Sequence, residues 1–321
     1  GSEMCIRDSP PVTREGRRMI KRIWACAVFL GLLALLLLGA GWALCPRSNA
    51  SVRFPTASAF AAEPENSFDY VILGDSLTLY ALAPKTILEQ QGIPGYNCSI
   101  PLQTLAQSRS YLERFFGCQS PRLVLLEANV LYREMSPAEP SLERVQSRFT
   151  VFRDHDNWKT TTLKTLTQCP RWTWRHDAWG YYESWKIEPA ATEQYMTDPQ
   201  TPAPIPEASQ RMLESLESLC RKQGARLMLI SVPNAKAWNL ERHRRVAALA
   251  EKLGIEYLDM NLEQVGLDWQ TDCLDGGDHL NARGAQKVSR YLAAYLADTG
   301  LFPDREEPRE TAGTLAGKGE S

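Results

Sequence analysis

The residues best suited to chemistry begin with a serine at the end of a short apolar run. Between Phe68 and Leu79 the sequence reads FDYVILGDSLTL, and the apolar run stops at Gly74, which is followed by Asp75 and Ser76. A serine there could attack an acyl carbon, but its hydroxyl needs a base, usually a histidine held by a carboxylate. The alternative is that Ser76 only forms a turn or caps a helix. The rest of the chain must therefore supply the partners.

Among the four histidines, His279 alone lies in a loop that looks suited to provide this base. The loop reads DCLDGGDHLNARGA, and it places Asp275 four residues and Asp278 one residue before the imidazole. Side chains of adjacent residues tend to diverge, which favours Asp275 as the carboxylate that orients His279, while Asp278 remains a candidate. The structural alternative is a surface histidine that caps the helix expected to follow.

Two further polar residues are candidates for contact with a substrate. His155 lies in the stretch DHDNW, near the beginning of an aromatic-rich segment, and Asn234 follows the apolar run RLMLISV. For both residues, the position in the sequence is the only support for a contact with a substrate. The cysteines show no CxxC spacing, so we expect no zinc ribbon and no thioredoxin-like redox motif, and we expect neither a metal nor a cofactor.

Strands and helices are expected to alternate through most of the chain. Apolar runs without polar alternation, separated by amphipathic helices, favour a parallel sheet that is covered on both faces. The sequence therefore predicts a three-layer α/β/α domain over residues 68–302, with its ligand site at the carboxyl ends of the strands. The expected strands cover 70–73, 123–127, 226–232 and 255–258, and the expected helices cover 84–91, 103–116, 207–222, 240–253 and 282–297.

Three segments fall outside this alternation. Residues 45–67 are rich in Ser, Ala, Pro and Asn, and are predicted to be a linker. Residues 135–205 carry most of the tryptophans and no long apolar period, which indicates an insertion lying over the strand ends. Residues 303–321 are polar and are predicted to be disordered.

An uncharged segment near the N-terminus indicates a membrane anchor. Residues 23–44 read IWACAVFLGLLALLLLGAGWAL, and about 20 apolar residues suffice to cross the hydrocarbon core. Basic residues in 1–22 precede it, which predicts a single-pass helix with its N-terminus in the cytoplasm and the bulk of the chain outside. Met19 is the expected natural start, so residues 1–18 would be an extension. A cleaved signal peptide is the alternative, although its apolar region is usually only about 7–15 residues.

The composition restricts the classes of partner and the redox chemistry. The chain has 321 residues, 36 basic and 38 acidic, with a net charge of −2, and this balance favours no nucleic-acid partner. Six of the eight cysteines, from Cys45 onward, would lie in a compartment that permits disulfides. Their pairing is open, and small buried cysteines are an equally good interpretation.

The order of these motifs resembles the SGNH (GDSL-type) hydrolase superfamily. The resemblance lies in GDS after the first strand and in a histidine preceded by aspartates near the C-terminus, and it covers about residues 68–132 and 225–298. YNCSIPLQT (96–104) and PRLVLLEAN (121–129) occupy the places of that family's second and third blocks. The carboxylate of that family normally precedes the histidine by three residues, a place that Gly276 occupies here.

The resemblance implies a Ser-His-Asp mechanism. Ser76 would be the nucleophile, His279 the base and then the acid, and the N–H groups of Ser76, Leu102 and Asn129 would form the oxyanion hole. Leu102 stands where the family has a glycine, and Asn129 falls about two residues early in the third block.

The implied activity is that of a serine-dependent ester hydrolase or O-acyltransferase acting on acylated glycans of the cell envelope. An anchor joined to such a domain is similar in architecture to envelope O-acylation proteins, which implies a multi-pass membrane acyltransferase as a partner. The alternative, suggested by the altered second and third blocks, is an inactive protein of this fold that binds polysaccharide or scaffolds an acylation complex.

Overall fold

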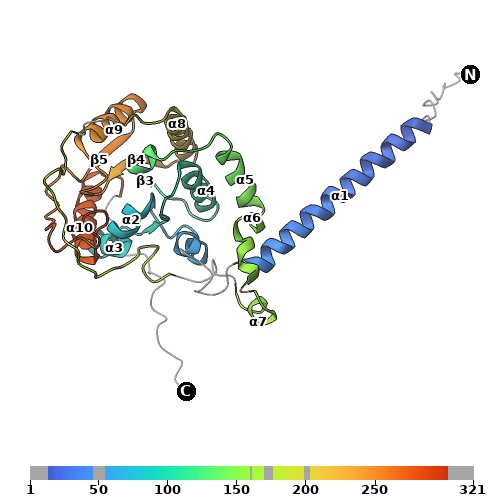
Figure 1. The fold of residues 1–321 in the computed structure, drawn as a ribbon, viewed down its shortest axis with the longest axis horizontal. Helices are drawn as coiled ribbons and strands as arrows, with labels where there is room; N and C mark the ends of the chain where they lie inside the picture. Colours follow the sequence, from blue (N-terminus) through green and yellow to red (C-terminus); the bar gives the residue numbers. More distant parts are fainter. Residues whose placement is uncertain (1–13, 46–54, 160, 170–175, 199–202, 303–321) are drawn as a thin grey trace, which may run out of the picture.

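The computed structural model describes residues 14–45, 55–159, 161–169, 176–198 and 203–302 (Figure 1). Its centre is one five-stranded sheet in the order β2-β1-β3-β4-β5, in which every neighbouring pair is parallel. The strands are β1 (Tyr70–Leu73), β2 (Gly95–Asn97), β3 (Leu123–Glu127), β4 (Arg226–Ser231) and β5 (Glu256–Asp259). The predicted α/β fold with a parallel sheet is thereby confirmed.

Successive apolar residues of each inner strand point to opposite faces of this sheet. Val71 and Leu73 join one hydrophobic core, while Tyr70 and Ile72 join the other. Strands that are apolar at every position can therefore bury both faces under helices. The sheet is the middle layer of three.

Different helices cover the two faces. The core that includes Val71 is closed by α4 (Leu105–Phe115), α8 (Glu207–Lys222) and α9 (Leu240–Leu253). The core that includes Ile72 is closed by α2 (Ser76–Ala81), α3 (Pro84–Gln91) and α10 (Ala282–Asp298). The short helices α2 and α3 both pack against α10, so the segment that follows β1 is held against the last helix of the chain.

The segment predicted to be a linker is in part a component of the domain. Pro55–Ala62 forms the 3-10 helix η2, and the Phe60 side chain is buried against the rings of Tyr96 and Phe115. The prediction of a linker over 45–67 is wrong for these residues. The small residues that suggested a flexible connection instead allow the backbone to pack closely on α4.

The predicted insertion divides into two parts. Its first half forms α5 (Glu139–Arg148), α6 (Val151–Asp154), the 3-10 helix η4 (His155–Lys159) and α7 (Leu163–Leu166), which lie beside α4 and the N-terminal helix (Figure 1). Its second half contacts the loop before α10, where Ser184 O accepts a bond from Ala282 N and Glu188 N donates to Cys273 O. This second half lies at the predicted site, whereas the first half does not. The remaining 3-10 helix, η3 (Ala128–Tyr132), follows β3.

The N-terminal helix α1 (Arg14–Leu44) projects from the body of the molecule (Figure 1). Within Gly16–Leu44 a stretch of 18 residues has a mean hydropathy of 2.6, so the helix is long and apolar enough to cross a membrane. Among the described cysteines none forms a disulfide, and Cys45, Cys98, Cys220 and Cys273 are buried. The predicted tail, 303–321, lies outside the described residues.

Candidate active site

Ser76 lies at the first turn of α2, directly after the carboxyl end of β1. Asp75 is the N-cap of this helix, and its Oδ1 accepts a bond of 3.0 Å from Leu77 N. The residue before Asp75 is Gly74, and the space around it admits no side chain. A Cβ at position 74 would lie 2.4 Å from Thr78 Oγ1 and 2.7 Å from Glu127 Cβ. This tight strand-to-helix turn leaves the Ser76 side chain half-buried at the edge of the sheet.

The loop before α10 brings His279 to Ser76. The imidazole Nε2 lies 2.7 Å from Ser76 Oγ, and Nδ1 lies 2.6 Å from Asp275 Oδ2. The other carboxylate oxygen of Asp275 accepts a bond of 2.7 Å from the His279 backbone N–H. Both oxygens of Asp275 are therefore engaged by the same histidine, and the imidazole is fixed in position and orientation between the carboxylate and the hydroxyl.

The structure also distinguishes the two candidate carboxylates. Asp278 Oδ2 lies 3.9 Å from His279 Nδ1, too far for a hydrogen bond, and the Asp278 side chain is 43% exposed. Asp275 reaches the imidazole because Gly276 and Gly277, with φ angles of 74° and 93°, turn the chain through the left-handed region. Two consecutive glycines thus accommodate the extra residue between this carboxylate and the histidine.

Asn234 lies behind this loop and not in an open part of the site. Its side chain is buried, and Nδ2 donates to Asp278 O at 2.7 Å and to Asp278 Oδ1 at 3.2 Å. Its Oδ1 accepts a bond of 2.9 Å from Lys236 N. The predicted substrate contact is replaced by a structural one, because both ends of the amide are used to hold the loop that carries His279.

The other predicted substrate contact, His155, begins η4, which packs against α1. No property of its side chain is described. Its contact with a substrate remains a prediction.

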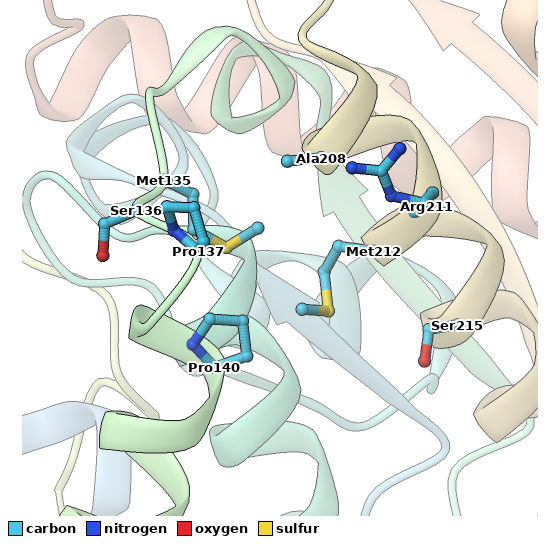
Figure 2. A pocket seen from close by; sticks show the side chains of 8 residues that line it. All are labelled: Met135, Ser136, Pro137, Pro140, Ala208, Arg211, Met212 and Ser215. Carbon is cyan, nitrogen blue, oxygen red and sulfur yellow. The ribbon is translucent and has the colours of Figure 1, made fainter.

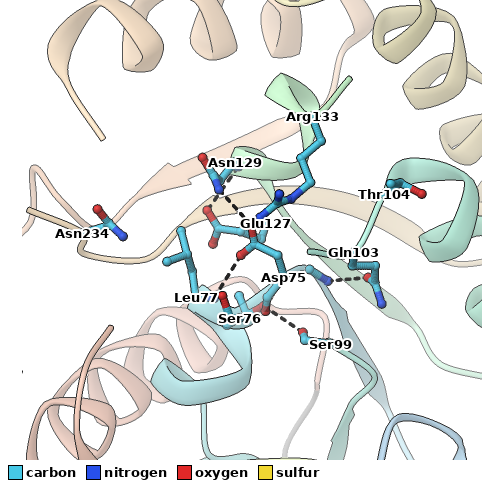
Figure 3. Close-up of polar contacts among 12 residues, drawn as sticks. Asp75, Ser76, Leu77, Ser99, Gln103, Thr104, Glu127, Asn129, Arg133 and Asn234 are labelled. Carbon is cyan, nitrogen blue, oxygen red and sulfur yellow. Dashed lines mark hydrogen bonds and ion pairs between the residues drawn. The ribbon is translucent and has the colours of Figure 1, made fainter. Parts of the chain in front are cut away.

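Asn129 lies next to Asp75 (Figure 3). Its Nδ2 donates to Asp75 Oδ2 at 2.8 Å, and its Oδ1 accepts a bond of 2.8 Å from Arg242 Nη1. Arg242 therefore sets which end of the amide faces Asp75. Because Nδ2 carries two hydrogens, one N–H remains after the bond to Asp75 is made.

Leu102 has a backbone φ of 60°, which is uncommon for a residue other than glycine. The side chain is 66% exposed. It lines a polar depression of ≈ 540 Å³ together with Asn129, Tyr132, Arg133 and Arg242. Leu102 thus adopts the left-handed conformation that a glycine would adopt most readily, and the structure brings it and Asn129 to the same depression.

Several residues that support the site carried no signal in the sequence. Arg133 Nη2 lies 2.9 Å from Asp75 Oδ2, and Gln103 Oε1 accepts a bond of 2.9 Å from Gly74 N (Figure 3). The Tyr80 ring lies 5.1 Å from the imidazole of His279, centroid to centroid. Only Tyr80, one turn after Ser76 in the same helix, could have been inferred from spacing.

Glu127 is a buried carboxyl group behind the serine. Burial, and then the charge of Asp75, raises the pKa of Glu127 well above its ordinary value. Its Oε1 accepts a bond of 3.3 Å from Asn129 N, and its Oε2 accepts one of 3.2 Å from Val232 N. Glu127 therefore ties the ends of β3 and β4 together beneath the site.

The carboxylates of Asp275 and Asp278 and the ring of His279 also lie close enough to share a cation, with donor atoms within 4.8 Å of one another. Nδ1, however, is at hydrogen-bond distance from Asp275, which suits an N–H donating to a carboxylate. A metal on Nδ1 would have to displace that proton. The contacts therefore fit a histidine that transfers protons through Nε2 better than a metal ligand.

The sequence matches no family model and no curated protein. The structure is similar to several solved structures, each at low identity. They include a protein assigned as an acylhydrolase from Bacteroides fragilis (15% identity, TM-score 0.40, covering 80% of this chain and 100% of that one). Another is the esterase EstA from Pseudoalteromonas sp. (12%, 0.39, covering 72% and 98%). A third is an acetyl-xylooligosaccharide esterase from Geobacillus stearmophilus (13%, 0.38, covering 76% and 100%). At such identities and TM-scores, the function must be argued from the geometry of Ser76, His279 and Asp275.

Proposed function

We propose that the chain is a serine-dependent ester hydrolase or O-acyltransferase, with Ser76, His279 and Asp275 as its catalytic residues. The observation that carries the proposal is the unbroken series of contacts from Ser76 Oγ to His279 Nε2 (2.7 Å) and from Nδ1 to Asp275 Oδ2 (2.6 Å). A serine that only capped a helix would not require an imidazole and a carboxylate aligned behind its hydroxyl.

The reaction would proceed through an acyl-enzyme. Ser76 Oγ attacks the acyl carbon while His279 Nε2 takes the hydroxyl proton, and Asp275 stabilises the imidazolium that forms. The imidazolium then gives that proton to the departing alkoxide, and an acyl-serine remains. Water or the hydroxyl of an acceptor, deprotonated by His279, attacks this ester, and the proton returns to Ser76 as the acyl group leaves.

The oxyanion of the tetrahedral intermediate needs hydrogen-bond donors. We assign this role to the backbone N–H groups of Ser76 and Leu102 and to the second N–H of the Asn129 amide. Support comes from the fixed orientation of that amide, whose Oδ1 is held by Arg242 Nη1 at 2.8 Å. The left-handed backbone at Leu102 supports an N–H donor there, because it turns the chain at the edge of the depression.

The substrate would be an acylated glycan outside the cytoplasm, reached by a chain that α1 anchors in the membrane. The polar depression of ≈ 540 Å³ beside Asn129 suits a hydroxyl-rich acceptor better than a lipid tail. For transfer, a multi-pass membrane acyltransferase would be the partner that supplies the acyl group. The length and hydropathy of α1 support the anchor.

The test uses the full chain in detergent with p-nitrophenyl acetate and a fluorophosphonate probe. Wild-type protein is expected to release nitrophenol and to be labelled at Ser76. The variants Ser76→Ala and His279→Ala should lose about 10⁴-fold or more in kcat, down to the residual catalysis that binding and the oxyanion hole provide.

The matched control is Ser99→Ala, because Ser99 is buried and bonds to Thr78 Oγ1 and not to the imidazole. Equal turnover by wild type and Ser76→Ala, with no label on Ser76, would refute the enzyme and favour an inactive binding protein. Adding a polyol acceptor to active enzyme then separates transfer from hydrolysis, because only transfer yields the acylated polyol.

A further inference from the structure

Helix α5 is oriented with its polar side toward the protein. Glu143, Arg144 and Ser147 line a cavity of ≈ 340 Å³, where they face Arg109 of α4 and Ser215 of α8. An adjoining cavity of ≈ 400 Å³ lies between the beginning of α5 and α8, and Figure 2 shows Pro140 of α5 across it from α8. None of the residues of α5 is buried.

The apolar side of α5 faces outward. Leu142 is 53% exposed and Val145 is 45% exposed, and the same spacing leads to the half-buried Phe149 and to Phe152 of α6, which is 46% exposed. Leu142 and Val145 lie on one face of α5, Phe149 is the C-cap of that helix, and Phe152 lies in the first turn of α6. These four residues are here called the outer stripe. A surface helix normally has the reverse arrangement, so the outer stripe calls for an apolar environment.

The α6 end of the outer stripe lies where the N-terminal helix meets the domain. The last turn of α1 packs on α6 and η4, and Asn157 Nδ2 donates to Leu44 O at 3.0 Å. Gly41 allows this close approach, because a Cβ there would lie 2.7 Å from Thr150 Oγ1. Figure 1 shows α5 and α6 beside the point at which α1 leaves the domain.

We propose that the outer stripe lies in the interfacial layer of the lipid bilayer that α1 crosses. The proposal rests on α1 being a membrane span and is independent of the chemistry at Ser76. The span predicted for α1 ends at Leu44, at the point where α6 and η4 pack, which places these elements at the boundary of the hydrocarbon core. The domain then contacts the membrane at two places, the end of α1 and the outer stripe.

The residues around the stripe fit this occupant. Trp158 of η4 is 64% exposed, and tryptophan is enriched where hydrocarbon meets headgroups. Arg148, the last residue of α5, is exposed and can reach anionic headgroups along its apolar stem, as can the exposed Lys164 of α7. A second membrane protein could also cover an apolar stripe, but the mixture of tryptophan and basic side chains favours lipid.

The test is photo-cross-linking of the full chain in vesicles of phosphatidylcholine and phosphatidylglycerol. Benzoylphenylalanine replaces Leu142 or, as a control of matched type and exposure, Leu262, which follows β5 and is 49% exposed. Lipid adducts, detected by mass spectrometry, are expected to be several-fold more abundant for position 142. Equal yields at both positions would overturn the proposal.

A second variant keeps the test informative if benzoylphenylalanine disturbs α5. Leu142→Ser combined with Val145→Ser alters only exposed side chains, so hydrolysis of a soluble ester should not change. With the protein in vesicles, amide hydrogen exchange in α5 is expected to become faster in this variant. Exchange in α9, the internal control in the same sample, should stay the same. Unchanged exchange of α5, or an adduct to a protein and not to lipid when position 142 is cross-linked in native membranes, would contradict the proposal.

Discussion

Within the part of the chain that the structure describes, two histidines bond to an aspartate, and one of these histidines also contacts a half-buried serine. His279 bonds to Asp275 at 2.6 Å and to Ser76 Oγ at 2.7 Å. His243 bonds to Asp259 at 2.9 Å, and Asp259 Oδ2 also accepts from Trp238 Nε1 at 2.8 Å. Among the described residues, no hydroxyl group bonds to the second ring nitrogen of His243.

The difference between the pairs lies in what the carboxylate does. The Asp259 carboxylate forms hydrogen bonds with Trp238, Tyr257 and His243, and through His243 it links α9 to the end of β5. The serine in that region, Ser231, is buried and contacts the Tyr257 hydroxyl at 3.1 Å. Asp275, in contrast, uses both oxygens on a single histidine. A histidine–aspartate pair is therefore not a catalytic signal unless the other ring nitrogen meets a half-exposed nucleophile.

The largest difference in activity between variants of the two pairs is expected at Asp275. Asp275→Asn should lower kcat by about 10⁴-fold, because an amide can hold the imidazole in the wrong tautomer. Asp278→Asn is the matched control, and a few-fold change is expected, since its carboxylate lies 3.9 Å from Nδ1. Steady-state kinetics with p-nitrophenyl acetate measure both. Equal losses in the two variants would mean that the histidine uses the other aspartate.

The second prediction concerns the donors that distinguish the first pair. Asn129→Ala should lower kcat by about 10²–10³-fold with little change in KM, because an oxyanion donor acts in the transition state. Arg242→Met should lower kcat less than Asn129→Ala does. In this variant the Asn129 amide is still present, but its orientation is no longer fixed. If Asn129→Ala raised KM alone, Asn129 would bind the ground state and not the oxyanion.

The third prediction separates the pairs by stability. His243→Ala should leave kcat unchanged and lower the free energy of unfolding by about 1 kcal/mol, because one of several hydrogen bonds to Asp259 is lost. Urea unfolding followed by circular dichroism gives the free energy. A large loss of kcat at unchanged stability would contradict a structural role for this pair.

The last prediction concerns Glu127, which lies between the two regions and whose effect appears only as a pH dependence of stability. Burial raises its pKa well above the ordinary value of 4.5, and the charges of Asp75 and Asp259 add to the effect. A raised folded-state pKa contributes stability that is fully present below the unfolded value and is lost as the pH rises through the folded value. Wild-type stability should therefore decline as the pH rises above 4.5, relative to Glu127→Gln. Parallel stability curves for the two proteins would show that Glu127 does not titrate differently on folding.

The long periodic elements were predictable from the sequence, and short or outward-facing ones were not. The predicted helices 207–222 and 240–253 coincide with α8 and α9, since each has a clear apolar period. The predicted helix 84–91 coincides with α3, which begins at Pro84 and is closed by Gly92. Strand β2 has three residues, too few for a pattern. Helix α5 was missed because its polar side faces the protein, so its apolar residues looked irregular among charges.

The site was predictable where its residues are close in sequence or share a motif. Ser76, His279 and the two aspartates stood in two short loops, and geometry was needed to choose between the carboxylates. Arg133 and Arg242 could not be found, because their contacts with Asp75 and Asn129 span 58 and 113 residues. Asn234 was located correctly at the end of β4, but the direction of its side chain was not knowable.

The backbone at Leu102 has a consequence for how this site could change over time. Because a main-chain N–H would face the substrate there, the side chain, 66% exposed, is not committed to packing. The φ of 60° restricts replacements to residues that tolerate a left-handed turn, with glycine and asparagine foremost. Position 102 therefore admits few replacements, and a replacement there would alter the rim of the polar depression without disturbing Ser76, His279 or the core.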